Sequence, residues 1–261
     1  MKESNLKIIA CIKQVPDSEA KVKAEDGQVT WGDAPLVINP FDEYAVEGAL
    51  QQKEALGGTV TALCIGPESA KEALKHALAM GADEAVLVSD PALENIDTVG
   101  AAKVLAAAIQ KIGDADMVMF GRQTLDNGAG LTPAQTAKVL GLPMLGWVGQ
   151  IKVEEGSVTV ERVLEEGRQI VKANLPAVLS LVQSIGEPRY PSFMGIRKAS
   201  KATIPLWSLG DLGMDAPAPV VTRAELMNPP AQETAIEMIA GETPAEIADK
   251  LADKIIAEKV L

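Results

Sequence analysis

Short apolar runs alternate with helix-patterned segments from Leu6 to Leu145, and this alternation limits the fold more than any other feature of the sequence. The apolar runs have the length of buried strands, whereas the segments between them repeat apolar residues at helical spacing. They predict strands at Leu6–Val15, Thr59–Ile65, Ala85–Val88 and Met117–Phe120, and helices at Phe41–Leu56, Ser69–Met80 and Thr98–Ile112. This order is typical of an α/β fold in which a parallel twisted sheet carries helices on both faces.

Strand-patterned segments replace the helices after Leu145. Alternating residues separated by glycine-bearing turns predict a small antiparallel β meander with strands at Ile151–Val153, Val158–Leu164 and Arg168–Ala173. A further buried strand is predicted at Pro176–Val182, and an earlier hairpin at Lys21–Trp31. The meander is therefore an addition to the α/β core rather than a continuation of its pattern.

Proline-rich sequence with scattered apolar residues begins at Leu206 and is poorly suited to form a core of its own. An unstructured tail would be more polar. We therefore divide the chain into an α/β domain at residues 1–205 and a C-terminal arm at residues 206–261, which packs on its own domain or on a partner subunit. In the arm, Thr243 as N-cap, Pro244 as the first helical residue and Glu246 in a capping box predict a helix that runs to about Ile256.

The segment Asp116–Thr132 predicts an anion-binding site, because a strand leads through a glycine-bearing loop to a helix N-terminus. Backbone N–H groups of such a loop can approach a phosphate, and the helix dipole favours negative charge there. Thr132 suits the N-cap and Pro133 the first helical position. The spacing matches neither a Walker A nor a GxGxxG pattern, and Asn127-Gly128 is also an ordinary turn dipeptide, so a turn without a ligand stays open as the alternative.

Composition excludes several classes of function. A formal net charge of −12 argues against non-specific nucleic-acid binding. Cys11 and Cys64 stand in apolar strand-like runs and are interpreted as small buried hydrophobes, while the single histidine, His76, has no obvious partner in the sequence. We therefore expect no metal site and no histidine-based catalytic group. No signal peptide or apolar run of membrane-spanning length is visible, which favours a cytoplasmic protein without direct membrane insertion.

Several longer motifs occur in order along the chain. They are CIKQVPD at Cys11–Asp17, NPFDEYAVE at Asn39–Glu47, ALAMGAD at Ala77–Asp83, GRQTLD at Gly121–Asp126 and EPRYPS at Glu187–Ser192. With these motifs the chain resembles the beta subunits of the electron transfer flavoprotein family over nearly its whole length. The predicted sheet and arm agree with that resemblance. It implies that residues 1–205, with the β meander and a recognition loop, form a Rossmann-like domain that binds an adenine nucleotide, and that the arm at residues 206–261 packs on a partner alpha subunit.

The resemblance implies a heterodimer whose alpha subunit carries most contacts to a redox FAD, while this chain forms a wall of the flavin pocket and holds a nucleotide of its own. Such a dimer carries electrons from dehydrogenases, such as acyl-CoA dehydrogenases, to a membrane quinone oxidoreductase during fatty acid or aromatic acid oxidation. It implies an electron carrier without catalytic residues of its own. A sensor or stress protein that binds an adenine nucleotide, as a homodimer without flavin, is the alternative from another class.

The identity of the nucleotide depends on the branch of the family. Housekeeping members hold AMP, whereas electron-bifurcating members hold a second FAD and usually read Asp-Gly-Asp-Thr-Ala-Gln-Val in the loop. This chain reads DNGAGLT at Asp126–Thr132, so the second acidic residue is missing and Leu131 replaces a polar side chain that both branches usually have there. The NPFDEYAVE motif is closer to the housekeeping branch. We favour AMP and keep electron bifurcation with a second FAD as the alternative.

The nucleotide-binding residues that the resemblance implies fall on strand ends, on the start of the first helix and on the loop. They are Cys11, Asn39, Pro40, Phe41, Asp42, Ile65, Gly121, Arg122, Gln123, Thr124, Leu125, Asp126, Asn127, Gly128, Ala129, Gly130, Leu131 and Thr132. Backbone groups at Cys11 and Ile65 can read an adenine edge, and the end of the loop can hold the phosphate. Phe41 matches an aromatic near the flavin of the alpha subunit, and a core residue that opens a helix is the less favoured alternative.

A second group of residues is predicted to bind protein partners. The stretch Glu187–Lys201 matches the recognition loop of the family, in which one exposed hydrophobic side chain enters a pocket on the partner dehydrogenase. Phe193 stands at that position, and Arg197, Lys198 and Lys201 follow it on an otherwise acidic chain. The alternative for these three cations is an ordinary solvated surface.

Overall fold

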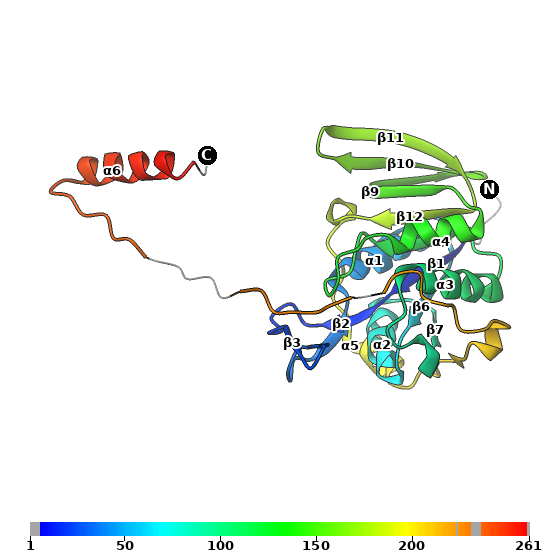
Figure 1. Ribbon diagram of the computed structural model, residues 1–261. Coiled ribbons are helices and arrows are strands. Elements are labelled where there is room, and N and C mark those ends of the chain that lie inside the picture. Colours follow the sequence, from blue (N-terminus) through cyan, green and yellow to red (C-terminus); the bar gives the residue numbers. More distant parts are fainter. Residues whose placement is uncertain (1–5, 223, 231–235, 260–261) are drawn as a thin grey trace. The chain divides into compact units, whose positions relative to one another are not determined.

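The computed structural model describes residues 6–222, 224–230 and 236–259 and contains one large mixed sheet. Nine strands form that sheet in the order β11-β10-β9-β12-β8-β1-β6-β7-β13 (Figure 1). Its parallel part consists of β1 (Leu6–Ile12), β6 (Gly58–Ile65), β7 (Glu84–Val88), β8 (Met117–Gly121) and β12 (Ala177–Leu181). The predicted α/β fold with a mostly parallel sheet is confirmed.

The chain reverses its direction of travel across the sheet at β1. It proceeds from β1 to β6 and β7 on one side, and then crosses to β8 and β12 on the other side. β1 therefore has β6 and β8 as parallel neighbours. In open α/β sheets, ligands bind outside the carboxyl ends of the strands at such a topological switch point. The position between β1 and β8 is consequently where a ligand site is expected.

Helices cover both faces of the sheet, as the alternating side chains of β1 demonstrate. Ile8, Ala10 and Ile12 belong to a core cluster that also contains residues of helices α1 (Pro40–Leu56) and α2 (Lys71–Met80). Ile9 and Cys11 belong to a second cluster with residues of α3 (Thr98–Ile112) and α4 (Thr132–Leu140). A strand that is apolar on both faces is what a sheet between two helical layers requires.

Both cysteines lie in these cores, as predicted. Cys11 and Cys64 are free and buried. Burial raises the pKa of Cys64 to about 12 and that of Cys11 well above its usual value. A nucleophilic or metal-binding cysteine needs a depressed pKa and some exposure. The two thiols therefore act as small hydrophobic side chains.

The predicted meander joins the main sheet rather than forming a separate one. Strands β9 (Met144–Glu154), β10 (Ser157–Leu164) and β11 (Gly167–Asn174) pair antiparallel in sequence order, and β9 also pairs parallel with β12. Figure 1 shows the three strands at the top of the view, beyond β12. The predicted hairpin is also present, with β3 (Lys23–Glu25) paired to β4 (Gln28–Thr30).

The first predicted strand is shorter than expected. β1 ends at Ile12, and Gln14–Pro16 forms a separate strand, β2, that pairs with β5 (Leu36–Ile38). The break falls at Lys13, whose backbone N–H donates to the Asp42 carboxylate and whose carbonyl accepts from the backbone N–H of Asn39. These bonds with the start of α1 replace the sheet bonds that would have continued β1.

Several short elements were not predicted. A seven-residue helix, α5 (Phe193–Ala199), packs on α2, and a two-residue strand, β13 (Leu206–Trp207), pairs parallel with β7. Single 3₁₀ turns form η1 (Glu68–Ala70), η2 (Pro91–Leu93), η3 (Gln183–Ile185) and η4 (Gly210–Leu212). Elements of this length carry too few residues for a periodic pattern.

By contacts within the chain, the protein divides into a unit that extends to Leu226 and a second unit that begins at Met227. The first unit thus includes β13 and η4 from the beginning of the predicted arm. In the second unit, α6 (Pro244–Ala257) begins as predicted: the Thr243 hydroxyl accepts from the Glu246 backbone N–H, and Glu246 accepts from the backbone N–H of Glu242. None of the residues of this helix is buried, and packing of the arm on a partner stays a prediction.

Candidate functional site

Asp42 connects the two strands at the switch point. One of its carboxylate oxygens accepts from the backbone N–H of Lys13, just after β1, at 2.8 Å, and the other accepts from the N–H of Gly121, the last residue of β8, at 3.2 Å. Burial raises the pKa of Asp42 to about 7, although the hydrogen bonds from Asn39, Lys13 and Gly121 favour its charged form. One side chain from the start of α1 thus fixes the carboxyl ends of β1 and β8 relative to each other.

Asn39 fastens the loop that follows β8. Its side chain is fully buried; the amide nitrogen donates to the carbonyl of Gln123 at 2.9 Å, and the amide oxygen accepts from the N–H of Leu125 at 3.1 Å. An asparagine can make both bonds because it carries a donor and an acceptor on one planar group. The motif Asn39–Asp42 therefore determines the path of the loop.

The loop itself is closed by local hydrogen bonds and one ion pair. The Gly128 N–H donates to the Thr124 carbonyl at 2.9 Å, and the Asn127 side chain accepts from the Ala129 N–H at 3.0 Å. Lys13 reaches across from the end of β1, and its Nζ lies 2.5 Å from a carboxylate oxygen of Asp126. Lys13 was not among the predicted site residues, because the sequence predicted a strand that continues through it to Val15.

Helix α4 begins one residue earlier than predicted. Thr132 is the first helical residue rather than the N-cap, and Leu131 occupies the N-cap position in a helical conformation. Gly130, with φ of 63°, makes the turn into the helix that a capping threonine would otherwise have made. The prediction of Thr132 as N-cap was wrong.

The start of α4 offers polar groups to a ligand. Within the described residues, no side chain caps this helix end, so its first N–H groups remain available. The hydroxyl of fully buried Thr136 and the side-chain oxygen of Gln135 also have no hydrogen-bond partner in the described part of the chain. Buried polar groups without partners are rare in proteins. The N–H groups at the helix end can donate to a nucleotide phosphate, whereas the Gln135 oxygen, which can only accept, cannot bond a phosphate oxygen.

Arg122 lies beside two aromatic rings. The carbon at the centre of its guanidinium lies 5.6 Å from the ring centroid of Phe41 and 4.9 Å from that of Trp147. Both distances are in the range of cation–π contacts. Trp147 was missed in the sequence because it lies 25 positions downstream on β9, and the spacing of residues gives no signal for such a contact. Phe41 is half-buried, which fits neither a pure core residue nor a fully exposed one.

The other two predicted contacts, Cys11 and Ile65, lie at the carboxyl ends of β1 and β6. Because these strands are parallel, both residues share one edge of the sheet with Gly121. The Cys11 side chain points into the core beneath α3 and α4, so only its backbone could contact a ligand. The structure thus gathers the predicted residues of β1, β6, β8 and α1 on a single edge.

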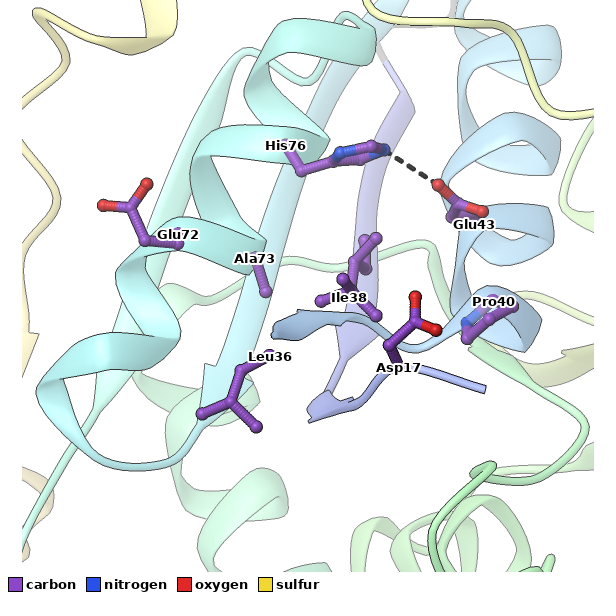
Figure 2. A pocket seen from close by; sticks show the side chains of 9 residues that line it. Asp17, Leu36, Ile38, Pro40, Glu43, Glu72, Ala73 and His76 are labelled. Carbon is purple, nitrogen blue, oxygen red and sulfur yellow. Dashed lines mark ion pairs between the residues drawn. The ribbon is translucent and has the colours of Figure 1, made fainter. Parts of the chain in front are cut away.

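A separate pocket of about 350 Å³ lies between β5, the start of α1 and α2. Of the predicted nucleotide-binding residues, only Pro40 lines it. Figure 2 shows His76 and Glu43 pointing toward each other across it, with His76 Nε2 2.8 Å from a carboxylate oxygen of Glu43. His76, for which the sequence showed no obvious partner, thus lies beside a carboxylate, although its Nε2 makes no hydrogen bond within the described residues. Among the described residues, no cluster of histidine, cysteine or carboxylate side chains could hold a metal ion.

The predicted protein-binding residues lie on and after α5. Phe193 is the first residue of this helix and is 84 % exposed, while Arg197, Lys198 and Lys201 are also exposed. The Ser192 hydroxyl caps the helix by accepting from the Gly195 N–H at 2.9 Å. A Cβ on Gly195 would come within 2.2 Å of the Ala79 carbonyl oxygen, so α5 rests directly on the backbone of α2. The helix therefore presents Phe193 from a fixed support.

Arg189 anchors the chain just before α5. Its guanidinium contacts the carboxylates of Glu47 and Glu54 on α1, with a distance of 2.8 Å from Nε to Glu47 Oε2. Glu47 is nearly buried; burial raises its pKa, but the hydrogen bonds and charge of Arg189 outweigh that effect and leave the pKa lowered. Without Arg189, Glu47 would be a buried charge without a partner, which is strongly destabilising.

Taken together, the fold and the loop define a doubly wound α/β protein whose switch point is the position where such sheets bind ligands. Residues 29–212 match the electron transfer flavoprotein domain. The chain therefore belongs to the electron transfer flavoprotein family, as a beta subunit.

Relatives cover this chain almost from end to end. The caffeyl-CoA reductase–Etf complex subunit CarD of Acetobacterium woodii is 35% identical over 98% of this chain and 100% of its own length. The electron transfer flavoprotein beta subunit of Mycobacterium tuberculosis is 36% identical over 97% of this chain and 99% of its own, and that of Megasphaera elsdenii is 32% identical over 98% and 100%. Family membership implies a complex with an alpha subunit and binding of a flavin or another nucleotide.

A search of the helices that the structure describes finds none that is both long and apolar enough to cross a membrane.

Proposed function

We propose that this chain is the beta subunit of a heterodimeric electron carrier in the cytoplasm, with AMP in its own nucleotide site. The proposal rests on the hydrogen bonds that Asn39 and Asp42 make at the switch point. These bonds hold the loop Gly121–Thr132, which leads into the uncapped start of α4. A helix start of this kind is suited to a phosphate monoester such as that of AMP.

The residues of this chain would bind and orient rather than react. The backbone at Cys11 and Ile65 would border the adenine, Gln123 and Asp126 would accept or donate hydrogen bonds to the ribose or base, and the residues from Asn127 to Thr132 would surround the phosphate. Phe41 would border the flavin that the alpha subunit holds. When bound, that FAD supplies the electron-transfer chemistry by accepting and releasing electrons.

The exposed helix α5 supports a role in docking to a dehydrogenase. Phe193 is an apolar side chain left in water, with Arg197, Lys198 and Lys201 nearby on an acidic chain. Aromatic residues and arginine are enriched in protein interfaces, and basic charges speed the encounter with an acidic partner surface. We propose that an acyl-CoA-type dehydrogenase delivers electrons through this surface and that a membrane quinone oxidoreductase receives them, in fatty acid or aromatic acid oxidation.

Electron bifurcation is the second candidate, with a second FAD in place of AMP. The observation that favours it is the similarity to CarD, a subunit of a reductase–Etf complex, at an identity close to that of the other relatives. Against it, the loop Asp126–Thr132 lacks the second acidic residue of bifurcating relatives. An adenine-nucleotide sensor, the candidate from another class, receives no support from the family match.

The nucleotide content of the purified heterodimer distinguishes these candidates. We expect about one FAD and about one AMP per heterodimer after denaturation and chromatography of the released nucleotides, because the loop offers one phosphate cradle without the acidic pattern of a second flavin site. The nucleotide content is measured again after gel filtration of the complex, which removes loosely bound nucleotide. Two FAD and no AMP would assign the chain to the bifurcating branch.

A further inference from the structure

We propose that Trp147 is a positioning residue that holds the guanidinium of Arg122 in place for the phosphate of the bound nucleotide. This inference rests on the proposed nucleotide site, and it adds a residue outside that site's motifs. Trp147 belongs to β9, whereas Arg122 follows β8, and β12 lies between the two strands.

The backbone at Trp147 is unusual for a large side chain. Its φ is 61°, in the left-handed region that few residues other than glycine adopt. The pairing of β9 with β12 shifts register here, because Leu179 pairs with Leu145 and Leu181 pairs with Val148. Two residues of β9, Gly146 and Trp147, therefore face the single residue Ser180. Such bulges redirect a side chain and are frequent next to functional sites.

Other side chains secure the bulge. The Nε of Arg162 donates to the Gly146 carbonyl at 2.8 Å, and the Ser180 hydroxyl accepts from the Trp147 N–H at 3.4 Å. With the backbone held in this way, the indole remains 44% exposed and lies 4.9 Å from the centre of the Arg122 guanidinium. A strained conformation that the surroundings stabilise is more typical of a functional position than of an ordinary strand.

The guanidinium of Arg122 has a hydrogen-bond donor that is not paired with an acceptor. Its Nε is buried and has no hydrogen-bond partner within the described residues, and its guanidinium lies over two aromatic rings. Stacking on aromatic rings restricts the guanidinium while leaving the N–H groups at its edge free to bind an anion bidentately. Under the proposed function, the anion nearest to Arg122 is the phosphate of the bound nucleotide.

Arg122 is also close to the part of the loop that leads into α4. A Cβ built on Gly130 would lie 3.4 Å from the Arg122 carbonyl oxygen, so the two backbone segments are in contact. Helix α4 in turn packs against β9, the strand that carries Trp147. The backbone at Arg122 thus contacts the residue two positions before the first residue of α4, and we infer that one phosphate accepts from both the stacked guanidinium and the helix N-terminus.

The test compares AMP with adenosine, which differ by the phosphate. Both are titrated by calorimetry into the heterodimer after removal of its nucleotide, for the wild type and for Trp147→Ala, Trp147→Phe and Arg122→Gln. We expect Trp147→Ala to weaken AMP about tenfold and adenosine less than about twofold, because the stacked cation contacts only the phosphate. Trp147→Phe retains an aromatic ring and should stay within about threefold of wild type.

A double variant tests whether Trp147 acts through Arg122. In the Arg122→Gln background, Trp147→Ala should add less than about a twofold loss, because the group that it positions is gone. Equal weakening of AMP and adenosine, or unchanged AMP binding in Trp147→Ala, would overturn the inference. If the wild-type complex retains FAD instead of AMP, the titrations compare FAD with riboflavin, and the same fold-changes are expected. If the complex binds neither AMP nor FAD, the proposed function is contradicted, and not only the role of Trp147.

Discussion

Replacing Gly121 by alanine is expected to weaken nucleotide binding to the heterodimer by about 100-fold, a loss of ~2.7 kcal/mol. A Cβ at this position would lie 2.4 Å from a carboxylate oxygen of Asp42 and 2.5 Å from the backbone carbonyl of Phe41. The backbone of α1 cannot yield as a flexible side chain would. The end of β8 must therefore move away from α1, and the loop that Asn39 and Asp42 hold moves with it.

Calorimetric titration of the nucleotide-free complex measures this loss. Gly210→Ala is the matched control, because its added Cβ would come no closer than 3.6 Å to the Ser208 hydroxyl and it lies in η4, away from the loop. The control should bind AMP like the wild type. If Gly121→Ala bound AMP equally well and unfolded at the same temperature, the switch point would not be the nucleotide site.

The Phe193→Ala variant should transfer electrons from the native dehydrogenase more than about tenfold more slowly at low concentrations of the complex, which requires a loss of only ~1.4 kcal/mol. The side chain is 84% exposed at the start of α5, so its removal costs the fold little. A partner that covers the ring would lose the burial of a large apolar surface, worth ~1.5–3 kcal/mol. Steady-state reduction of the complex by the dehydrogenase measures the effect.

Val22→Ala provides the control for loss of an exposed apolar side chain, since Val22 is 63% exposed and precedes β3 rather than α5. Both variants should keep the wild-type flavin content and melting temperature. An early-melting Phe193→Ala variant would mean that Phe193 supports the fold. Unchanged turnover with an intact fold would move the docking contact to another part of the surface.

The sequence predicted the core elements well where a long pattern existed. Helix α3 occupies Thr98–Ile112 as predicted, because fifteen residues with one apolar face, an acidic N-cap and a final glycine leave little freedom. The sequence did not predict α5, since seven residues after a proline-rich stretch show no periodicity. The break at Lys13 was also missed, because it depends on hydrogen bonds to the distant residues Asn39 and Asp42.

For the candidate site, the sequence identified the loop but not the contacts that shape it. Asn39 and Asp42 were chosen from a resemblance, and only the structure assigns their hydrogen bonds to Gly121, Gln123 and Leu125. Trp147 could not be predicted, since its approach to Arg122 requires a bulge in β9 and the placement of β12 beside β8. Such contacts come from strand order, which local patterns do not encode.

The electron capacity of the purified heterodimer tests most directly the claim that this chain holds AMP beside a single redox flavin. Anaerobic titration with dithionite, followed by the flavin absorbance, should reach completion at about two electrons per heterodimer, because one FAD accepts two electrons and AMP accepts none. Uptake of about four electrons per heterodimer would require a second flavin and would contradict the account.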